Sequence, residues 1–184
     1  MKKLLLIMGD LATGKSTFAN MLSKRYDTVL FCKDTIKETL GNTFGFSNRA
    51  ENLKLSHGTA ELMYLILAEF GKVNQALILE SNFHTAELER MHEIALEHDY
   101  EVLTLVLRGN VEILHKRYLN RMYHENRHPV HLSTTIDVFE DFKSCIESLR
   151  SEQIPGRTLS IQADNFAYQT NEEILSKIDA FMRD

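Results

Sequence analysis

A glycine-rich segment near the start of the chain has the residue types of a phosphate-binding loop. Residues 9–16 read Gly-Asp-Leu-Ala-Thr-Gly-Lys-Ser and match the pattern G-x-x-x-x-G-K-[ST]. Glycines let the backbone wrap closely around phosphates, and N–H groups at a helix N-terminus supply partial positive charge. The Lys15 ammonium suits the β- and γ-phosphates, and the Ser16 hydroxyl is a hard ligand for Mg²⁺. The segment therefore predicts a site for ATP and Mg²⁺, in which Lys15 is also catalytic.

Acidic side chains follow two later apolar segments. Asp34 comes after Thr28–Phe31, and Glu80 ends Ala76–Glu80. A carboxylate at position 34 can accept the proton of an attacking hydroxyl, but aspartate is equally common as a helix N-cap. The carboxylate at position 80 can orient Mg²⁺ through water, or serve as a capping or ion-paired group. Asp34 is therefore a candidate for either a catalytic base or a helix cap, and we expect Glu80 to be a metal-site residue and Asn82 a contact for the acceptor.

Arginines cluster in one later segment. Arg117 and Arg121 are four residues apart, so a helix places both on one face, and Arg127 follows. Guanidinium groups on one face suit a phosphate and the charge that develops on it during transfer. The alternative is a solvated basic helix end that complements the helix dipole. The segment resembles the lid of nucleotide-type kinases, which implies a small helical lid over residues 117–131, in which Arg117 contacts ATP and both Arg117 and Arg121 act in catalysis.

Three histidines of this segment, His124, His128 and His131, have a spacing that permits zinc. No cysteine or second cluster of ligands lies nearby in the sequence, so polar lid histidines are the simpler interpretation. The expected metal is therefore Mg²⁺, held by Ser16 and Glu80.

Short apolar segments alternate with longer amphipathic ones, which is the pattern of β-α-β units. The short segments are continuously apolar, as in a parallel sheet that is covered on both faces. The expected strands are Lys3–Met8, Thr28–Phe31, Ala76–Glu80, Val102–Leu107 and Thr158–Ile161. The expected helices are Lys15–Lys24, Asp34–Leu40, Ala50–Phe70, Ala86–His98, Val111–Tyr123, Thr134–Leu149 and Asn171–Met182, with Gly41, Thr85, Asn110 and Ser133 as capping residues.

Five parallel strands with crossover helices predict a three-layer α/β/α fold, whose ligands bind at the carboxyl ends of the strands. The 184 residues suffice for one domain, expected over residues 1–184. A formal net charge of −5 argues against wholesale binding of a nucleic acid backbone. The apolar run Leu4–Met8 is far too short to span a bilayer, so no membrane segment is expected. Two cysteines, Cys32 and Cys145, make no disulfide framework, so we expect a cytoplasmic setting.

The glycine-rich segment Gly9–Thr17, combined with Lys-Asp-Thr-Ile-Lys at residues 33–37, resembles a group of P-loop kinases: the zeta toxins, chloramphenicol phosphotransferases and polynucleotide kinases. In that group an aspartate after the second strand, followed closely by a basic residue, is the catalytic base. The resemblance implies a nucleoside- and nucleotide-kinase-like P-loop fold, with Asp34 as the base and Lys37 as a substrate contact. Glu80 departs from the pattern, because similar kinases often carry aspartate there.

The lid segment resembles that of nucleotide-type kinases, in which arginines close over ATP. The resemblance also implies that residues 162–165, Gln-Ala-Asp-Asn, pass the adenine ring. A closing lid excludes water and limits wasteful hydrolysis of ATP.

The acceptor pocket is expected between the helix of Asp34 and the helix Ala50–Phe70. His57 and Glu61 of the second helix can contact a hydroxylated substrate, or form an ordinary surface pair at i,i+4. The residues expected to bind the acceptor are Asp34, Lys37, His57 and Asn82. Those expected to bind ATP are Gly9, Asp10, Leu11, Ala12, Thr13, Gly14, Lys15, Ser16, Thr17 and Arg117.

These features predict an ATP-dependent kinase that transfers the γ-phosphoryl group to a hydroxyl of a small molecule. A switch GTPase would carry an Asn-Lys-x-Asp motif, which the sequence lacks. One alternative is a polynucleotide 5′-end kinase, which needs a basic channel leading to Asp34. Another is a non-catalytic ATP-binding regulatory protein, which would be indifferent to Asp34→Ala.

Overall fold

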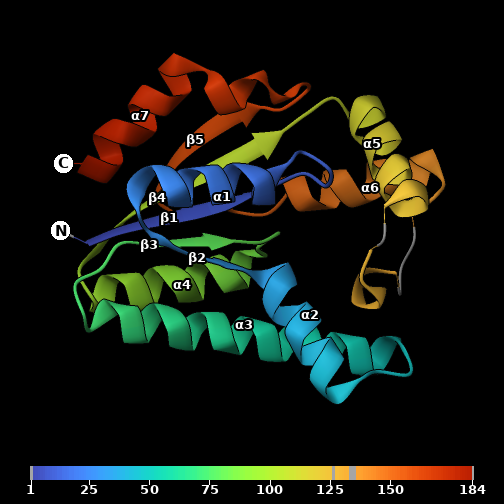
Figure 1. The fold of residues 1–184 in the computed structure, drawn as a ribbon, viewed down its shortest axis with the longest axis horizontal. Coiled ribbons are helices and arrows are strands. Elements are labelled where there is room, and N and C mark those ends of the chain that lie inside the picture. Colours follow the sequence, from blue (N-terminus) through green and yellow to red (C-terminus); the bar gives the residue numbers. More distant parts are fainter. Residues whose placement is uncertain (1, 126, 133–135, 184) are drawn as a thin grey trace.

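The computed structural model describes residues 2–125, 127–132 and 136–183. Within these residues, parallel strands form a five-stranded sheet in the order β2-β3-β1-β4-β5, so that β1 lies at its centre (Figure 1). All five expected strands are confirmed, with ends shifted by one or two residues. The strands are β1 (Lys2–Gly9), β2 (Val29–Cys32), β3 (Leu77–Glu80), β4 (Tyr100–Arg108) and β5 (Arg157–Gln162).

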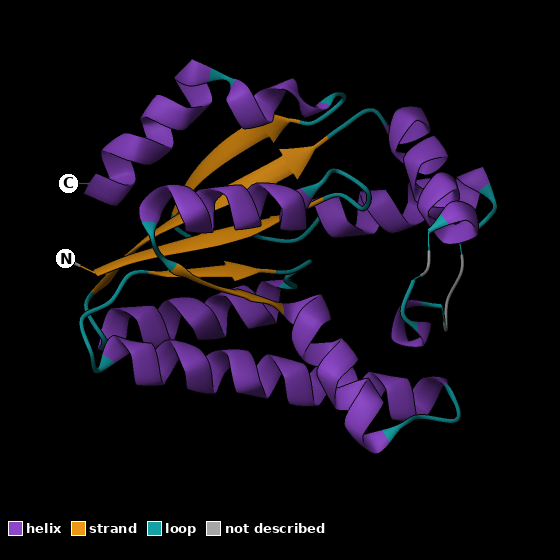
Figure 2. Cartoon of the chain, in the orientation of Figure 1, coloured by secondary structure: helices purple, strands orange, loops and turns teal. Residues whose placement is uncertain are grey.

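Helices cover both faces of the sheet. Figure 2 shows the strands between two layers of helices, with α1 and α7 on one face and α3 and α4 on the other. This arrangement confirms the expected three-layer α/β/α fold. No helix in the described parts of the chain is long and apolar enough to cross a membrane. The α-helices are α1 (Lys15–Tyr26), α2 (Lys33–Phe44), α3 (Arg49–Gly71), α4 (Thr85–Glu97), α5 (Val111–His124), α6 (Phe139–Arg150) and α7 (Glu172–Arg183).

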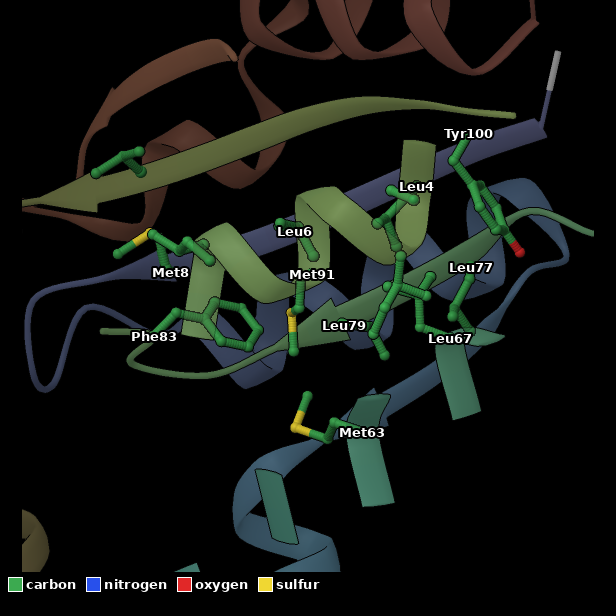
Figure 3. Packing of buried hydrophobic residues seen from close by; sticks show 14 residues of the cluster. Leu4, Leu6, Met8, Met63, Leu67, Leu77, Leu79, Phe83, Met91 and Tyr100 are labelled. Carbon is green, nitrogen blue, oxygen red and sulfur yellow. The ribbon is translucent and has the colours of Figure 1, made fainter. Parts of the chain in front are cut away.

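The central strand β1 is buried on both sides. Leu4, Leu6 and Met8 pack into the core under α3 and α4, which Figure 3 shows from close by, whereas Leu5 and Ile7 pack into the core under α1 and α7. Each of these side chains contributes about 1.5–3 kcal/mol when it is fully buried. Burial on both faces therefore explains why this strand is continuously apolar in the sequence.

The register of the sheet aligns the strand ends that carry the candidate residues. Cys32 at the end of β2 lies opposite Glu80 at the end of β3, and Glu80 lies opposite Ile7 of β1. The helices α2, α5 and α6 gather at this carboxyl edge, away from the two chain termini (Figure 1). The fold thus brings three separate segments of the sequence to one edge.

The end of α2 differs from the prediction. Gly41 was expected to cap this helix, but α2 continues to Phe44 and ends at Gly45, which has φ of 69° and donates its N–H to the Gly41 carbonyl. Gly41 is buried, and a Cβ at this position would lie 2.4 Å from Val130 Cγ1. The glycine therefore permits close packing inside the helix instead of ending it.

The starts of α4 and α6 also differ from the prediction. The helix α4 begins at Thr85 itself, with His84 as N-cap, because the Thr85 hydroxyl and N–H both donate to Glu152. The helix α6 begins at Phe139, later than expected, although Ile136 still contributes to the apolar stripe by packing against the α5–α6 core. The expected cap Ser133 and the expected start at Thr134 lie outside the described residues. The predicted cap Asn110 is confirmed, since its side chain accepts from two N–H groups of α5.

Candidate active site

The glycine-rich loop joins the end of β1 to the start of α1. Gly9 has φ of 132°, and a Cβ there would lie 2.0 Å from the carbonyl oxygen of Leu107. Gly14 has φ of 88°, and a Cβ there would lie 2.9 Å from both Phe166 Cε1 and the Tyr168 hydroxyl. Both positions require glycine, because a side chain would be strained and would collide with neighbouring groups.

Asp10 anchors this loop to the rest of the protein. Its carboxylate is 1% exposed and accepts hydrogen bonds from Arg150 Nη2 at 2.6 Å and from the Gly109 N–H at 3.0 Å. Its own N–H donates to the Leu107 carbonyl, and its carbonyl accepts from the Thr13 hydroxyl. The side chain and N–H of Asp10 are thus engaged within the protein, so this residue supports the loop.

Arg150, the partner of Asp10, carries no signal in the sequence. It is an ordinary arginine in the last turn of α6, 140 residues away from Asp10. A basic residue at a helix C-terminus is explained by the helix dipole alone. Only the packing of α6 beside the loop reveals the ion pair.

Lys15 is buried at the first position of α1. Its ammonium group donates to the carbonyl of Asp10 at 2.7 Å and to that of Gly9 at 3.1 Å. Burial lowers the pKa of Lys15, and the charges of Glu80 and Asp34 oppose this effect. The ammonium group therefore lies in the field of both candidate carboxylates.

Ser16 and Glu80 form a direct contact. The Ser16 hydroxyl donates to Glu80 Oε2 at 3.0 Å. Burial raises the pKa of Glu80, whereas Lys15 and the hydrogen bond from Ser16 lower it. A hydroxyl and a carboxylate are hard oxygen donors of the kind that Mg²⁺ prefers, and this ion usually takes its remaining ligands from water and substrate phosphates. The pair therefore fits the predicted metal site.

Asp34 lies in the first turn of α2 and is exposed. The N-cap of this helix is Cys32, so the capping role that the sequence left open for Asp34 is not the one observed. Its carboxylate forms no hydrogen bond with any side chain or backbone group in the described ranges. It is thus available to a ligand.

A cavity of about 760 Å³ joins these groups at the carboxyl edge of the sheet. Lys15, Ser16, Asp34 and Glu80 all line it. The other expected residues that line it are Leu11, Ala12, Gly14, Thr17, Lys37, Asn82, Arg117, Arg121 and Arg127. Gly9, Asp10 and Thr13 are not among the lining residues and form the support of the loop instead.

Arg117 of α5 is held against the segment that follows β5. Its guanidinium group donates to the carbonyls of Ala163, at 2.9 Å, and Asp164. The same group lies over the ring of Phe166, 4.5 Å from the ring centre. Phe166 lines the cavity, belongs to the short helix η2 (Phe166–Thr170) and is 51% exposed. The sequence analysis did not anticipate an exposed phenylalanine beside the glycine-rich loop. The one signal in the sequence was its position, directly after residues 162–165.

Arg121 and Arg127 approach the cavity from the segment predicted as a lid. Arg121 Nε lies 3.5 Å from Glu125 Oε2, in a half-exposed pair. Arg127 is half-buried, and burial together with the charge of Arg121 lowers its pKa. Both arginines therefore bring positive charge to the region between the loop and Asp34.

The chain matches no protein-family model and no curated protein. Solved structures do match it. A kinase candidate from Chloroflexus aurantiacus J-10-fl superposes with a TM-score of 0.82 at 24% identity, covering 98% of both chains. A gluconokinase from Sinorhizobium meliloti 1021 gives 0.59 at 13% identity, covering 98% of this chain and 94% of that one. A shikimate kinase from Bacteroides thetaiotaomicron gives 0.56 at 14% identity, covering 98% of both.

The chain has the P-loop kinase fold. Within this fold the cavity occupies the carboxyl ends of the strands, beside the central strand β1. Strand order changes direction at β1, which pairs with both β3 and β4, and such switch points are where open α/β sheets bind ligands.

Of two residues expected to bind the acceptor, one lines the cavity and the other does not. Asn82 lines the cavity, and its buried Oδ1 has no hydrogen-bond partner in the described part of the chain. His57 is exposed and does not line the cavity, whereas the preceding residue, Ser56, does. Successive residues of a helix point in directions about 100° apart. A prediction that is wrong by one residue therefore names a side chain on a different face of α3, away from the cavity.

The histidines of the predicted lid contact α2. His128 Nε2 lies 2.9 Å from Asn42 Oδ1, and His131 Nε2 lies 2.7 Å from Glu38 Oε1. His124 ends α5 and is exposed. Two of the three rings are therefore engaged by protein side chains from another helix.

The segment after α5 docks between α2 and α3. Its short helix η1 (Pro129–His131) buries Val130, whose carbonyl accepts a 2.9 Å hydrogen bond from Asn52 of α3. A second cavity of about 550 Å³ lies beside it, and Asp34, Arg121 and Arg127 line both cavities. The candidate base thus faces the space between the phosphate loop and the docked segment.

Proposed function

We propose that this protein is an ATP-dependent kinase that transfers the γ-phosphoryl group of ATP to a hydroxyl group of a small molecule. The observation that carries the proposal is that Asp34, without a hydrogen-bond partner among the described residues, lines the same cavity as Lys15 and the Ser16–Glu80 pair. A regulatory protein that only binds ATP needs the loop, but it has no use for an available carboxylate beside it.

ATP would occupy the cavity with its phosphates on the loop. The N–H groups at the start of α1 and the Lys15 ammonium bind the β- and γ-phosphates. Arg117 and Phe166 lie where the adenine ring follows, and a planar cation and an aromatic ring both stack on a base. Mg²⁺ held by Ser16 and Glu80 would neutralise negative charge on the phosphate oxygens.

Asp34 would act on the acceptor. As the acceptor oxygen forms its bond to the γ-phosphorus, the bond from that phosphorus to the bridging oxygen breaks and ADP leaves. The hydroxyl proton passes to the Asp34 carboxylate. Arg121 stabilises the charge on the transferring group, and the segment over residues 117–131 acts as the lid that excludes water.

The finer family assignment is part of the same proposal. The glycine-rich loop followed by Lys-Asp-Thr-Ile-Lys at residues 33–37 supports a place among the zeta toxin, chloramphenicol phosphotransferase and polynucleotide kinase group. A solvent-accessible Asp34 in the first turn of α2 is consistent with the base of that group.

An acceptor panel with γ-labelled ATP tests the proposal. The panel contains sugars, sugar acids, nucleosides, hydroxylated antibiotics and an oligonucleotide with a free 5′-hydroxyl. We expect transfer to a small molecule, and a fall in kcat of about 10²–10⁴-fold in Asp34→Asn because the base is lost. The matched control is Asp141→Asn, which changes an exposed aspartate in the first turn of α6 and leaves transfer unchanged.

Nucleotide binding provides a second readout. Lys15→Ala should abolish detectable binding of Mg·ATP in calorimetry, whereas Asp34→Asn should retain it. Wild-type protein that does not bind Mg·ATP, or transfer that survives Asp34→Asn, would contradict the proposed function. Transfer to the oligonucleotide alone would replace the small-molecule acceptor with a nucleic acid end.

A further inference from the structure

The α2 wall of the cavity carries a lysine that forms no ion pair within the described part of the chain. Lys33 and Lys37 are four residues apart in α2, and both line the cavity. Lys33 is paired with Glu87, with 2.6 Å between the charged atoms. Lys37 is half-buried and forms neither an ion pair nor a hydrogen bond with any residue that the structure describes.

The ammonium group of Lys37 is partly shielded from solvent and lies near other charged groups. Burial lowers the pKa of its ammonium group, and the charges of Lys33 and Arg49 act in the same direction, whereas Asp34 opposes them. Burying a cation without a counter-ion is costly. An anion bound beside Lys37 would offset that cost.

A second half-buried cation lines the same cavity as Asp34. Arg127 lines the cavity from the segment after α5, and its guanidinium group contacts Met122 Sδ at 3.7 Å. The charge of Asp34 acts on Arg127 as it acts on Lys37. The candidate base therefore shares the cavity with two half-buried cations, and neither of them belongs to the phosphate loop.

The same cavity is also lined by polar groups that can bind a hydroxylated molecule. The Asn82 carboxamide has a buried oxygen without a partner within the described ranges, and the Ser56 hydroxyl makes only a long contact, 3.4 Å, to the Asn52 carbonyl. Burying a carboxamide oxygen without a hydrogen-bond donor destabilises the protein. A substrate hydroxyl that donates to this oxygen would remove that cost. These groups select for alcohols, and the cations select for negative charge.

We propose that the acceptor is a small hydroxylated anion, which places an alcohol at Asp34 and a carboxylate or phosphate group at Lys37. This inference rests on the proposed kinase function. Asn82 accepts a hydrogen bond from a hydroxyl of the acceptor, and Arg127 covers the anionic group from the lid side. An ammonium group on a four-carbon stem recognises either anion as a point charge, so both chemistries share one site.

Binding of paired probes tests the inference without requiring turnover. Wild-type protein is saturated with Mg²⁺ and a non-hydrolysable ATP analogue, and calorimetry then measures the binding of glycerate, glycerol 3-phosphate, glycerol, gluconate and glucose. We expect an anionic probe to bind about tenfold or more tightly than its neutral partner, as one charge-assisted contact provides. The carboxylate and phosphate arms show which anion the site prefers.

Variants assign the preference to Lys37. Lys37→Met should remove it, and Lys37→Arg, which keeps the charge, should retain most of it. The control is Lys54→Met, at an exposed lysine of α3 that does not line the cavity. Equal binding of anionic and neutral probes, absence of binding by every anionic probe, or a preference that survives Lys37→Met would each overturn the inference.

Failure of this inference differs from failure of the proposed function. If the ATP analogue binds and the anionic preference is missing, the kinase proposal stands and the acceptor is neutral. If the ATP analogue itself does not bind, the kinase proposal fails first.

Discussion

The Ser16 hydroxyl donates a 3.0 Å hydrogen bond to the Glu80 carboxylate, although 64 residues separate them in the chain. Ser16 is the second residue of α1, directly after Lys15, and Glu80 ends β3, the strand beside β1. The parallel register places both oxygens at the same edge of the sheet. This contact supports the proposed metal site and leads to the first prediction.

Glu80→Gln should weaken the binding of the Mg²⁺ that supports nucleotide binding. The amide keeps the volume and can still accept from Ser16, but it removes the negative charge. We expect the Mg²⁺ concentration for half-maximal ATP binding to rise about tenfold or more. Calorimetric titration of Mg²⁺ at fixed ATP measures it. Glu89→Gln, at an exposed glutamate of α4, is the control, and an unaltered Mg²⁺ dependence in Glu80→Gln would remove this residue from the metal site.

Arg150→Met should destabilise the protein strongly. The change leaves the Asp10 carboxylate, which is 1% exposed, without its cationic partner. Removing one member of a buried pair costs about 3–5 kcal/mol, and we expect about 3 kcal/mol here because the Arg150 side chain is partly exposed. Urea unfolding measures the free energy. Arg157→Met breaks an exposed 3.7 Å pair with Glu101 and should cost no more than about 0.5 kcal/mol, so equal losses in the two variants would contradict the anchoring role.

Phe166→Ala should weaken binding of ATP without weakening binding of a bare polyphosphate. Stacking of one base on an aromatic ring contributes about 1–3 kcal/mol, so we expect the Kd for ATP to rise about tenfold. Tripolyphosphate, which lacks the base, should bind both proteins equally. Phe44→Ala, at a 75% exposed phenylalanine that ends α2, is the control. If both ligands lose affinity to the same extent, Phe166 supports the loop instead of the adenine ring.

Glu152 should make stability depend on pH in the acid range. Its carboxylate accepts from the Thr85 N–H at 2.7 Å and hydroxyl at 2.5 Å and lies 2.7 Å from His84 Nδ1, and these contacts lower the pKa of Glu152 to about 2. Because the folded pKa is below the ordinary value of 4.5, the stabilisation is complete above that value and disappears as the pH falls towards 2.

Glu152→Gln should therefore lower the free energy of unfolding at pH 7 by about 1–2 kcal/mol, since hydrogen bonds to a charged acceptor are replaced by weaker ones. The difference from wild type should shrink as the pH falls from about 5 to about 2. Thermal unfolding across this range measures the effect. Glu147→Gln, at an exposed position of α6, should have little effect, and a difference for Glu152→Gln that is constant with pH would count against the hydrogen bonds as its source.

The fold was largely predictable because the signals that define it are local. Continuous apolar runs gave all five strands, and the capping residue Asn110 marked the start of α5. The errors arose where a distant contact changed the outcome of a local pattern. Glycine is the residue type that commonly ends a helix, so the sequence suggested that α2 ends at Gly41. In the structure Gly41 lies inside α2, where the absence of a side chain makes room for Val130.

The candidate site was only partly predictable for the same reason. The expected acceptor residue His57 lies outside the cavity, and its neighbour Ser56 lies within it, since the rotation of α3 about its axis depends on packing. Phe166 was not anticipated, because an aromatic residue in a loop has many ordinary explanations.

The sequence by itself determined the phosphate loop, the alternation of strands and helices, and the candidacy of Asp34. Each depends on residues that are neighbours in the chain, so spacing and residue type are sufficient. Tertiary structure alone decided which distant groups lie together: Ser16 bonds to Glu80, Asp10 pairs with Arg150, and Lys37 and Asn82 line one cavity. These relationships depend on sheet register and helix packing, which arise when the whole core is buried and which no local pattern encodes.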